Sequence, residues 1–136
     1  MLKILLIDDD LDSIEPIKII LNSEGFWTET AQSPEEGIEK VKQVNPDLVI
    51  LDVMMPNDYE GFEVARHIRE KLDLKALPII ILSNVHNVKQ VPYRFAPDEN
   101  FLPVDVFIDK PVDPDMLLDT VNTLLGEKRV DPKTPL

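Results

Sequence analysis

The sequence predicts an α/β fold: a doubly wound, five-stranded parallel sheet with helices on both faces. Short apolar runs bounded by polar residues alternate along the chain with segments whose apolar residues recur at helical spacing. Runs that are apolar at nearly every position are typical of strands buried on both faces, as in a parallel sheet covered by helices. Right-handed crossovers between parallel strands leave few possible topologies, and among them we expect the strand order 2-1-3-4-5.

Five segments are predicted to be strands because each is a short run between turn-forming residues, mostly rich in β-branched and other apolar side chains. The first, third and fifth runs end at or directly before acidic residues. The five segments are Lys3–Ile7, Phe26–Ala31, Asp47–Asp52, Ile79–Ser83 and Val104–Ile108.

The first two predicted helices have recognisable starts. Ser13 is a plausible N-cap of the first helix, which places Pro16 in the first turn, where its missing N–H matters little. Ser33, Pro34 and Glu36 predict the start of the second helix as its cap, its first residue and its capping-box partner.

The last two predicted helices follow the third and fifth strands. Asp113 is expected to cap the final helix, with Pro114 at its first position and Gly126 at its end. The third helix is predicted from apolar residues at helical spacing. Its inward-facing residues are Phe62, Ala65, Ile68 and Leu72.

The segment between the fourth and fifth strands shows no clean helical stripe. It runs from Asn84 to Pro103 and also contains Pro92 and Pro97. Proline lacks a backbone donor and breaks helices, so we expect an irregular or shortened fourth helix here. We interpret residues 85–103 as an irregular surface that is specific to a partner protein.

Length and composition indicate one domain, with residues 1–126 as its body and residues 127–136 as a polar C-terminal tail. No apolar stretch approaches the roughly 20 residues of a membrane span. The chain contains no cysteine and lacks a signal-peptide pattern, which favours a cytoplasmic protein. A net charge of -12 argues against direct contact with nucleic acid or with an anionic membrane, since both attract basic surfaces.

Charged residues stand where three of the predicted strands end. Asp8 and Asp9 follow the first strand, Asp52 ends the third, and Lys110 closely follows the fifth. The carboxyl ends of parallel strands share one edge of the sheet, where ligands bind in such folds. The three aspartates are therefore expected to meet between the first and third strands, with Lys110 reaching in from the far side. Clustered carboxylates repel, so this arrangement calls for a cation, a proton or a function.

Four segments carry a resemblance to a known family: LLIDDD, LVILDVMMP, PIIILSN and VFIDKP, in this order and spacing. Each alone is a weak signal, whereas four in register at predicted strand ends are specific. Over roughly residues 2–125 the chain resembles the receiver domain of bacterial response regulators, of the chemotaxis-regulator type. The resemblance implies a flavodoxin-like fold and a phosphorylation switch in a two-component system.

The resemblance implies which residues bind metal and accept phosphate. Asp52 corresponds to the aspartate that accepts the phosphoryl group. Asp8 and Asp9 correspond to the acidic pair that holds Mg²⁺ (or Mn²⁺), Asp9 directly and Asp8 mainly through water. Met54 is expected to lend its backbone carbonyl to the metal. Such an all-oxygen site suits Mg²⁺.

The same resemblance implies roles for three positions near the fourth and fifth strands. Ser83 corresponds to the hydroxyl residue that bonds a phosphoryl oxygen, and Lys110 to the lysine that pairs with the phosphoryl group. Phe107 stands at the aromatic switch position. A cis peptide bond is expected between Lys110 and Pro111.

Less specific interpretations stand beside these roles. For residues 8–10 the alternative is a helix-capping loop, for Lys110 a solvated side chain, and for Ser83 a helix cap. Phe107 has the alternative of a simple core residue. The nearby residues Asp10 and Asp109 are interpreted as solvated charge.

The chain departs from the family pattern around the expected pocket. The loop after Asp52 is one residue longer before Gly61 than usual, and Asn84 replaces a small residue after Ser83. The segment that leads to Lys110 is also longer than usual. The first two departures are expected to change access to the acceptor site, and the third to change the surface that the family uses for output and dimerisation.

The predicted function is a phosphorylation switch, not an enzyme, although it catalyses its own phosphorylation and dephosphorylation. The donor is a histidine kinase, a phosphotransfer protein or a small acyl phosphate, and the output is altered affinity for a partner protein. We expect a stand-alone receiver, or a receiver that is part of a longer protein. The alternative is a degenerate receiver that serves as an interaction module without phosphorylation. A Mg²⁺-dependent hydrolase ranks last, because no second general base is evident.

Overall fold

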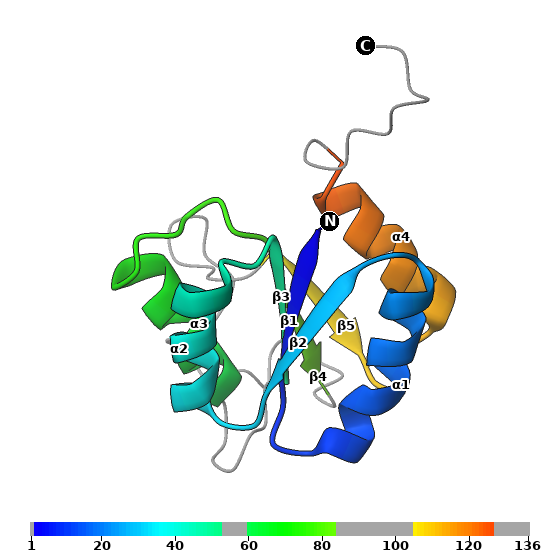
Figure 1. Cartoon of the computed structure of the whole chain (residues 1–136), viewed down its shortest axis with the longest axis horizontal. Coiled ribbons are helices and arrows are strands. Elements are labelled where there is room, and N and C mark those ends of the chain that lie inside the picture. The colour runs from blue at the N-terminus through cyan, green and yellow to red at the C-terminus, as the bar shows by residue number, and fades with distance from the viewer. Residues whose placement is uncertain (1, 53–59, 84–104, 127–136) are drawn as a thin grey trace.

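The sheet has the predicted strand order and direction. A computed structural model describes residues 2–52, 60–83 and 105–126, and its five strands pair in parallel in the order β2-β1-β3-β4-β5 (Figure 1). The predicted fold class is therefore confirmed. The described elements are β1 (Lys3–Ile7), α1 (Leu11–Ser23), β2 (Trp27–Ala31), α2 (Pro34–Val44), β3 (Leu48–Asp52), α3 (Glu60–Glu70), β4 (Ile79–Ser83), β5 (Val106–Asp109) and α4 (Pro114–Leu124).

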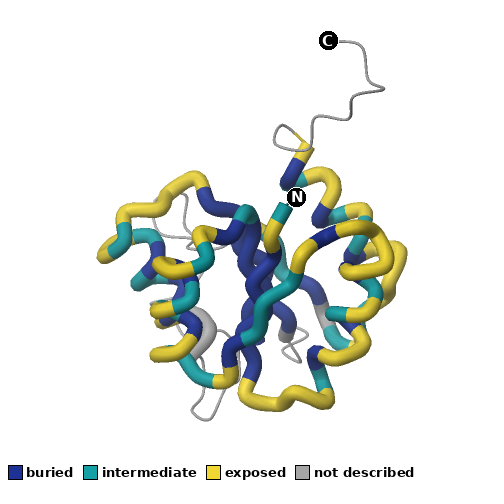
Figure 2. The backbone as a smooth tube through the Cα atoms, in the orientation of Figure 1, coloured by how far each residue is buried: buried dark blue, intermediate teal, exposed yellow. Residues whose placement is uncertain are grey.

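Helices cover both faces of the sheet (Figure 1): α2 and α3 lie on one face, and α1 and α4 on the other. Successive strand residues point to opposite faces. In β1, Leu5 and Ile7 therefore pack toward α2 and α3, while Ile4 and Leu6 pack toward α1 and α4. Figure 2 shows the buried backbone following the central strands. Burial on both faces explains why β1 and β3 are apolar almost throughout.

Two predicted helix starts are confirmed. Ser33 caps α2, and its hydroxyl accepts a hydrogen bond from the N–H of Glu36 at 3.1 Å. The Glu36 carboxylate in turn accepts one from the N–H of Gln32 at 3.3 Å. Asp113 caps α4 by accepting a hydrogen bond from the N–H of Asp115 at 3.0 Å. These side chains satisfy donors that have no partner inside the helix.

The predicted cap of α1 was wrong. The helix begins at Leu11, and its N-cap is Asp10, not Ser13; the Asp10 carboxylate accepts a hydrogen bond from the N–H of Asp12 at 3.0 Å. Aspartate caps helices as well as serine does, so the earlier residue starts the helix. Pro16 therefore lies inside α1, not in its first turn, and cannot donate to the carbonyl of Asp12.

β5 is displaced relative to the predicted strand. It covers Val106–Asp109, whereas residues 104–108 were expected. Asp105 precedes it, and its carboxylate accepts a hydrogen bond from the N–H of Ile79 at 2.8 Å. The Asp105 side chain thus serves as the hydrogen-bond acceptor for the N–H of Ile79, in the place that a backbone carbonyl would fill in a longer β5.

Several predictions concern parts of the chain outside the described residues. They are the irregular segment 85–103 with its shortened helix, the longer loop after Asp52, Met54, Asn84 and the tail 127–136. Within the described ranges, no helix is long and apolar enough to cross a bilayer.

Gly37 brings α2 close to β1, and its replacement tests that packing. A Cβ atom at residue 37 would lie 2.6 Å from Cδ1 of Ile7, a side chain that is 1% exposed. Overpacking costs about 1–3 kcal/mol, whereas the better helix propensity of alanine returns up to about 1 kcal/mol. We therefore expect Gly37→Ala to lower the free energy of unfolding by about 1–2 kcal/mol, measured by urea denaturation.

A second variant identifies the cause. Ile7→Val removes the Cδ1 atom and costs about 1 kcal/mol alone. Combined with Gly37→Ala, it should cost less than the sum of the two single losses, because the clash is relieved. Strictly additive losses would show that Ile7 does not limit the space at residue 37.

Candidate functional site

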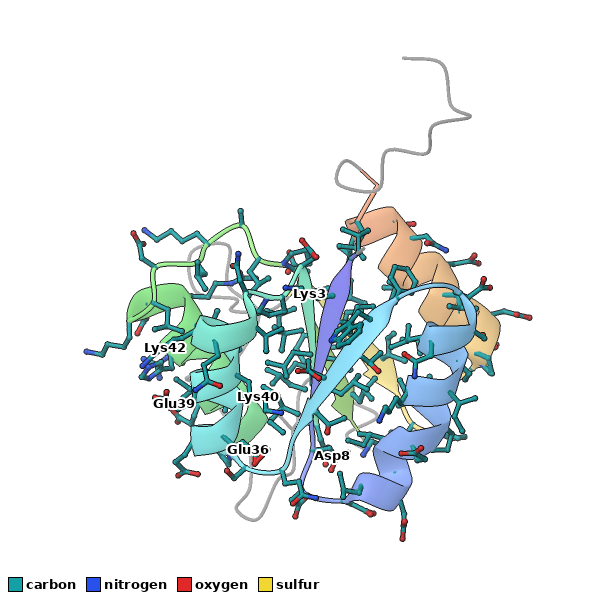
Figure 3. The ribbon with its side chains drawn as sticks, viewed as in Figure 1. Lys3, Asp8, Glu36, Glu39, Lys40 and Lys42 are labelled. Atoms are coloured by element: carbon teal, nitrogen blue, oxygen red, sulfur yellow. The ribbon has the colours of Figure 1, made fainter. Side chains whose placement is uncertain are left out.

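Charged side chains from three strands meet at the carboxyl edge of the sheet. Asp8 directly follows β1, and Asp52 is the last residue of β3. These strands are neighbours with Ile7 opposite Leu51, so their register sets Asp8 beside Asp52. Figure 3 shows Asp8 at this edge, where the chain leaves β1 toward α1.

Asp8 is the most buried member of the group, with 1% of its surface exposed. Its N–H donates to the carbonyl of Ala31 at 3.0 Å, and its Oδ1 accepts a hydrogen bond from the N–H of Asp10 at 2.9 Å. Its Oδ2 is buried and receives no hydrogen bond from the described residues. A buried carboxylate oxygen without a donor is unfavourable unless a cation or a proton meets it.

The surroundings of Asp8 raise its pKa from 3.8 to about 7. Burial is the largest cause, because a poorly solvated site disfavours the charged form. The neighbouring Asp52 raises the pKa further, whereas the Asp10 N–H and the Lys110 ammonium lower it. In the metal-free protein, protonated and ionised Asp8 are therefore both populated near neutral pH.

Asp8, Asp9 and Asp52 are close enough to share one cation. One carboxylate oxygen from each lies within 4.8 Å of the others. Asp9 is exposed and Asp52 is 8% exposed, so a hydrated ion can approach from solvent. Carboxylate oxygens and water are the ligands that Mg²⁺ prefers. This donor set, with Oδ2 of Asp8 left open, fits a divalent cation.

Lys110 places a positive charge beside Asp52 and reaches it from the end of β5, which is separated from β3 by β4. Its Nζ lies 3.3 Å from Oδ1 of Asp52, and the two side chains are 20% and 10% exposed. β4 stands between β3 and β5, so the lysine reaches across the end of that strand. The bond between Lys110 and Pro111 is cis, as predicted. Lys110 is therefore a cationic donor next to Asp52, and Asp52 also lies beside the acidic pair of Asp8 and Asp9.

The remaining predicted residues lie on β4 and β5 or outside the described ranges. Ser83 ends β4, opposite Asp109 of β5. Phe107 lies in β5 opposite Ile81, is half-buried, and packs against the core cluster beneath α2 and α3. Met54 is outside the described residues. The residues brought together are Asp8, Asp9, Asp52 and Lys110.

Asp10 is exposed, as its interpretation as solvated charge implies, but it also caps α1, so the capping alternative given for residues 8–10 is confirmed at this residue. Its side chain is exposed, but its N–H binds Oδ1 of Asp8 while its carboxylate caps α1. The start of α1 therefore fixes one oxygen of Asp8 and leaves Oδ2 for another ligand. In the sequence, the feature that indicates this role of Asp10 is the preference of aspartate for N-cap positions, which equals that of serine.

A family model described as the response regulator receiver domain matches residues 4–122. The chain belongs to this family. The resemblance based on the strand-end segments is thereby confirmed, and family membership is consistent with a part in two-component signalling.

Relatives of this receiver differ in how much of their length matches. Protein PilH of Pseudomonas aeruginosa is 27% identical over 129 residues, which cover 93% of this chain and 99% of PilH. Response regulator MprA of Mycobacterium leprae is 33% identical over 131 residues, 96% of this chain and 54% of MprA. Transcriptional regulatory protein ResD of Bacillus subtilis is 41% identical over 81 residues, 60% of this chain. The match spans only 32% of ResD.

Solved structures of receivers share the fold. The response regulator TrrA of Thermotoga maritima, solved in complex with Mg²⁺ and BeF, is 34% identical with a TM-score of 0.76, covering 92% of this chain and 100% of TrrA. The chemotaxis protein CheY4 of Vibrio cholerae is 27% identical with a TM-score of 0.77, covering 92% of this chain and 99% of CheY4.

The raised pKa of Asp8 predicts a pH response of the metal-free receiver. Asp8 keeps its proton up to about pH 7 in the folded state, whereas the unfolded chain releases it near 3.8. Between these values the folded state binds more protons, so the stability due to Asp8 is complete below the lower pKa and is lost as the pH rises through the higher one. We expect the free energy of unfolding in EDTA to fall, from about pH 5 to about pH 8, more steeply than in Asp8→Asn, by on the order of 2 kcal/mol.

Urea denaturation at constant ionic strength measures this difference. Asp119→Asn, on the exposed side of α4, is the matched control and should keep the wild-type slope. Equal slopes for the wild type and Asp8→Asn would contradict a raised pKa at Asp8.

Proposed function

We propose that this receiver is a phosphorylation-dependent switch of a two-component system, with Asp52 as the phosphoryl acceptor. The observation that carries the proposal is the position of Asp52 between an acidic pair and a lysine. It shares a cation-sized group of oxygens with Asp8 and Asp9, and its Oδ1 is 3.3 Å from Nζ of Lys110. The family match and the Mg²⁺–BeF complex of TrrA support the same function.

The proposed reaction moves a phosphoryl group from a phosphohistidine to a carboxylate. One oxygen of Asp52 attacks phosphorus in line with the P–N bond of the donor. An O–P bond forms while the P–N bond breaks, and its electron pair stays on the imidazole nitrogen of the donor. With a small acyl phosphate, the leaving group is the carboxylate of the donor. Water returns the aspartyl phosphate to Asp52 and inorganic phosphate, so the chain acts on itself and is not an enzyme with a separate substrate.

Asp8, Asp9 and Asp52 are the proposed protein ligands of Mg²⁺ (or Mn²⁺), together with the backbone carbonyl predicted for Met54. The bound ion supplies positive charge against the phosphoryl oxygens and relieves the repulsion among the three acids. Oδ2 of Asp8 is the oxygen that we assign to the hydrated ion, because the described residues offer it no hydrogen bond.

Lys110 and Ser83 are the proposed partners of the bound phosphoryl group. Lys110 already contacts the acceptor carboxylate, and with little movement its ammonium group can form an ion pair with a phosphoryl oxygen instead. Phosphorylation adds up to about two negative charges beside it. That change biases β4 and β5, with Phe107 as the proposed aromatic switch, toward a second arrangement.

The proposed partners are proteins at both stages. A histidine kinase or a phosphotransfer protein supplies the phosphoryl group, and a downstream protein reads the switched surface. The net charge of -12 favours protein partners over nucleic acid and anionic membranes. The cytoplasmic location stays a prediction from the sequence.

Phosphoryl uptake tests the function directly. Incubation with acetyl phosphate and Mg²⁺ should add a single phosphoryl group, detected by intact-protein mass spectrometry, and EDTA should prevent it. Asp52→Asn should take up none, because its amide is a poor nucleophile. Lys110→Ala should react more slowly, by on the order of 100-fold, since a positioned charge at the transition state is lost.

Asp73→Asn provides the matched control for removing one carboxylate. Asp73 is exposed and lies in the connection after α3, at a left-handed position that asparagine tolerates. It should react like the wild type. Uptake by Asp52→Asn would assign the acceptor to another residue, and no uptake by the wild type from any donor would favour the phosphorylation-independent interaction module.

Metal binding is tested by thermal melting without any phosphoryl donor. A ligand that binds only the folded state stabilises it by about 2.7 kcal/mol at 100 times its Kd. Mg²⁺ should therefore raise the Tm of the wild type and of Lys110→Ala, and should raise it much less in Asp8→Asn and Asp9→Asn. A wild-type melt that stays unchanged at high millimolar Mg²⁺ would exclude the proposed metal site.

A further inference from the structure

A second ion pair lies at the opposite edge of the sheet from the acceptor site. Arg69 is near the C-terminal end of α3, and its Nη2 lies 3.0 Å from Oδ2 of Asp105, the residue before β5. Its Nη1 donates to the carbonyl of Leu74 at 2.8 Å and to the carbonyl of Leu77 at 2.5 Å. The Arg69 side chain is only 15% exposed, so these charge-assisted hydrogen bonds are partly shielded from water.

Asp105 uses the same carboxylate oxygen to hold the start of β4. Its Oδ2 accepts a hydrogen bond from the N–H of Ile79 at 2.8 Å, and its own N–H donates to the carbonyl of Ile79 at 2.9 Å. Arg69 and Asp105 therefore join the end of α3, the connection that follows it, and the starts of β4 and β5.

β5 is a short strand at the edge of the sheet formed by the described strands, so few backbone hydrogen bonds fix its position. It has four residues and pairs with β4 alone among the described strands. Its far end leads directly to Lys110, whose contact with Asp52 is 3.3 Å long. One residue of strand spans about 3.3 Å, so a slip by one residue would break that contact. The slip would also exchange the faces on which Phe107 and Ile108 pack.

We propose that Arg69 and Asp105 are positioning residues for phosphorylation: they fix β5 along its axis and thereby hold Lys110 beside Asp52. The inference rests on the proposed function of Asp52 and Lys110. The hydrogen bonds described for the pair all lie at the amino edge of the sheet, away from the acidic group. Arg69 thus acts on the reaction through β5, and the proposed metal-binding carboxylates, which follow β1 or end β3, do not depend on it.

Arginine suits this position better than lysine. The guanidinium group presents several donors in one plane, and here they reach two carbonyls and one carboxylate together. A lysine ammonium is a single point with a flexible stem and cannot span the same three acceptors. Arg69→Lys should therefore restore the phosphorylation rate only in part when compared with Arg69→Met.

A double-mutant cycle on the full chain tests the proposal. The rate of phosphorylation by acetyl phosphate is measured at saturating Mg²⁺, well below the melting temperature, for Arg69→Met, Lys110→Ala and the combined variant. In the wild-type background Arg69→Met should slow the reaction by about tenfold. In the Lys110→Ala background it should have little further effect, because both changes remove the same contribution. Losses that multiply fully would overturn a role through Lys110.

Two further variants distinguish a specific effect on β5 from a general loss of stability. Asp105→Asn keeps an acceptor for the N–H of Ile79 but removes the charge that pairs with Arg69, and it should show a smaller loss with the same dependence on Lys110. Arg66→Met removes a 3.9 Å pair with Glu70 on the same helix, where the arginine side chain is 40% exposed, and should leave the rate unchanged. An equal loss in Arg66→Met would show that the effect is not specific to β5.

Readouts other than phosphorylation separate this inference from the proposed function. In Arg69→Met the rise in Tm with Mg²⁺ should match the wild type, while the amides of Phe107 and Ile108 exchange hydrogen faster and that of Leu51 does not. If the wild type takes up no phosphoryl group, the proposed function fails, and hydrogen exchange still tests the anchoring of β5. Unchanged exchange in β5 would overturn the positioning role.

Discussion

The parallel pairing of β1 with β3 forces two carboxylates together, and the site depends on this constraint. Once Ile7 stands opposite Leu51, the next residues along both strands are Asp8 and Asp52. Apolar packing on both faces of the sheet holds that register, so the acids cannot separate to relieve their repulsion. Burial and, to a smaller extent, this repulsion make the ionised form of Asp8 costly and raise its pKa to about 7. A cation bound between the acids, as proposed, would remove the cost and would couple metal binding to stability.

The acidic side chains and the lysine reach the site from different parts of the sheet. The acids stand on central strands, and α1 fixes Asp8 further through the N–H of Asp10. Lys110, Ser83 and Phe107 belong to β4 and β5 or follow them directly, and β5 has a neighbour on one side among the described strands. In the proposed switch, a charge change at Asp52 would therefore act on β5, the strand with fewer neighbours.

The sequence allowed the fold and the acidic group to be predicted because both rest on local signals. Strand periodicity and polar strand ends are visible without coordinates, and parallel topology brings those ends to one edge. The start of α1 was mispredicted because Asp10 and Ser13 cap equally well and no local signal ranks them. The pairing of Arg69 with Asp105 was not found, since 36 residues separate them and each looks like an ordinary surface charge in sequence.

β5 lies between two ion pairs. Before the strand, Asp105 pairs with Arg69, and after it, Lys110 pairs with Asp52. A phosphoryl group on Asp52 would strengthen the pull on Lys110, while Arg69 resists movement of the strand at Asp105. An anchor that is too weak would lose the position of the lysine, and one that is too strong would prevent β5 from responding. The exposure of Asp105, whose side chain is 40% exposed, keeps its pair with Arg69 weaker than a fully buried one that would lock the strand. If Asp52 is the acceptor as proposed, the strength of this distant pair would set how far a charge change there can move the edge of the sheet.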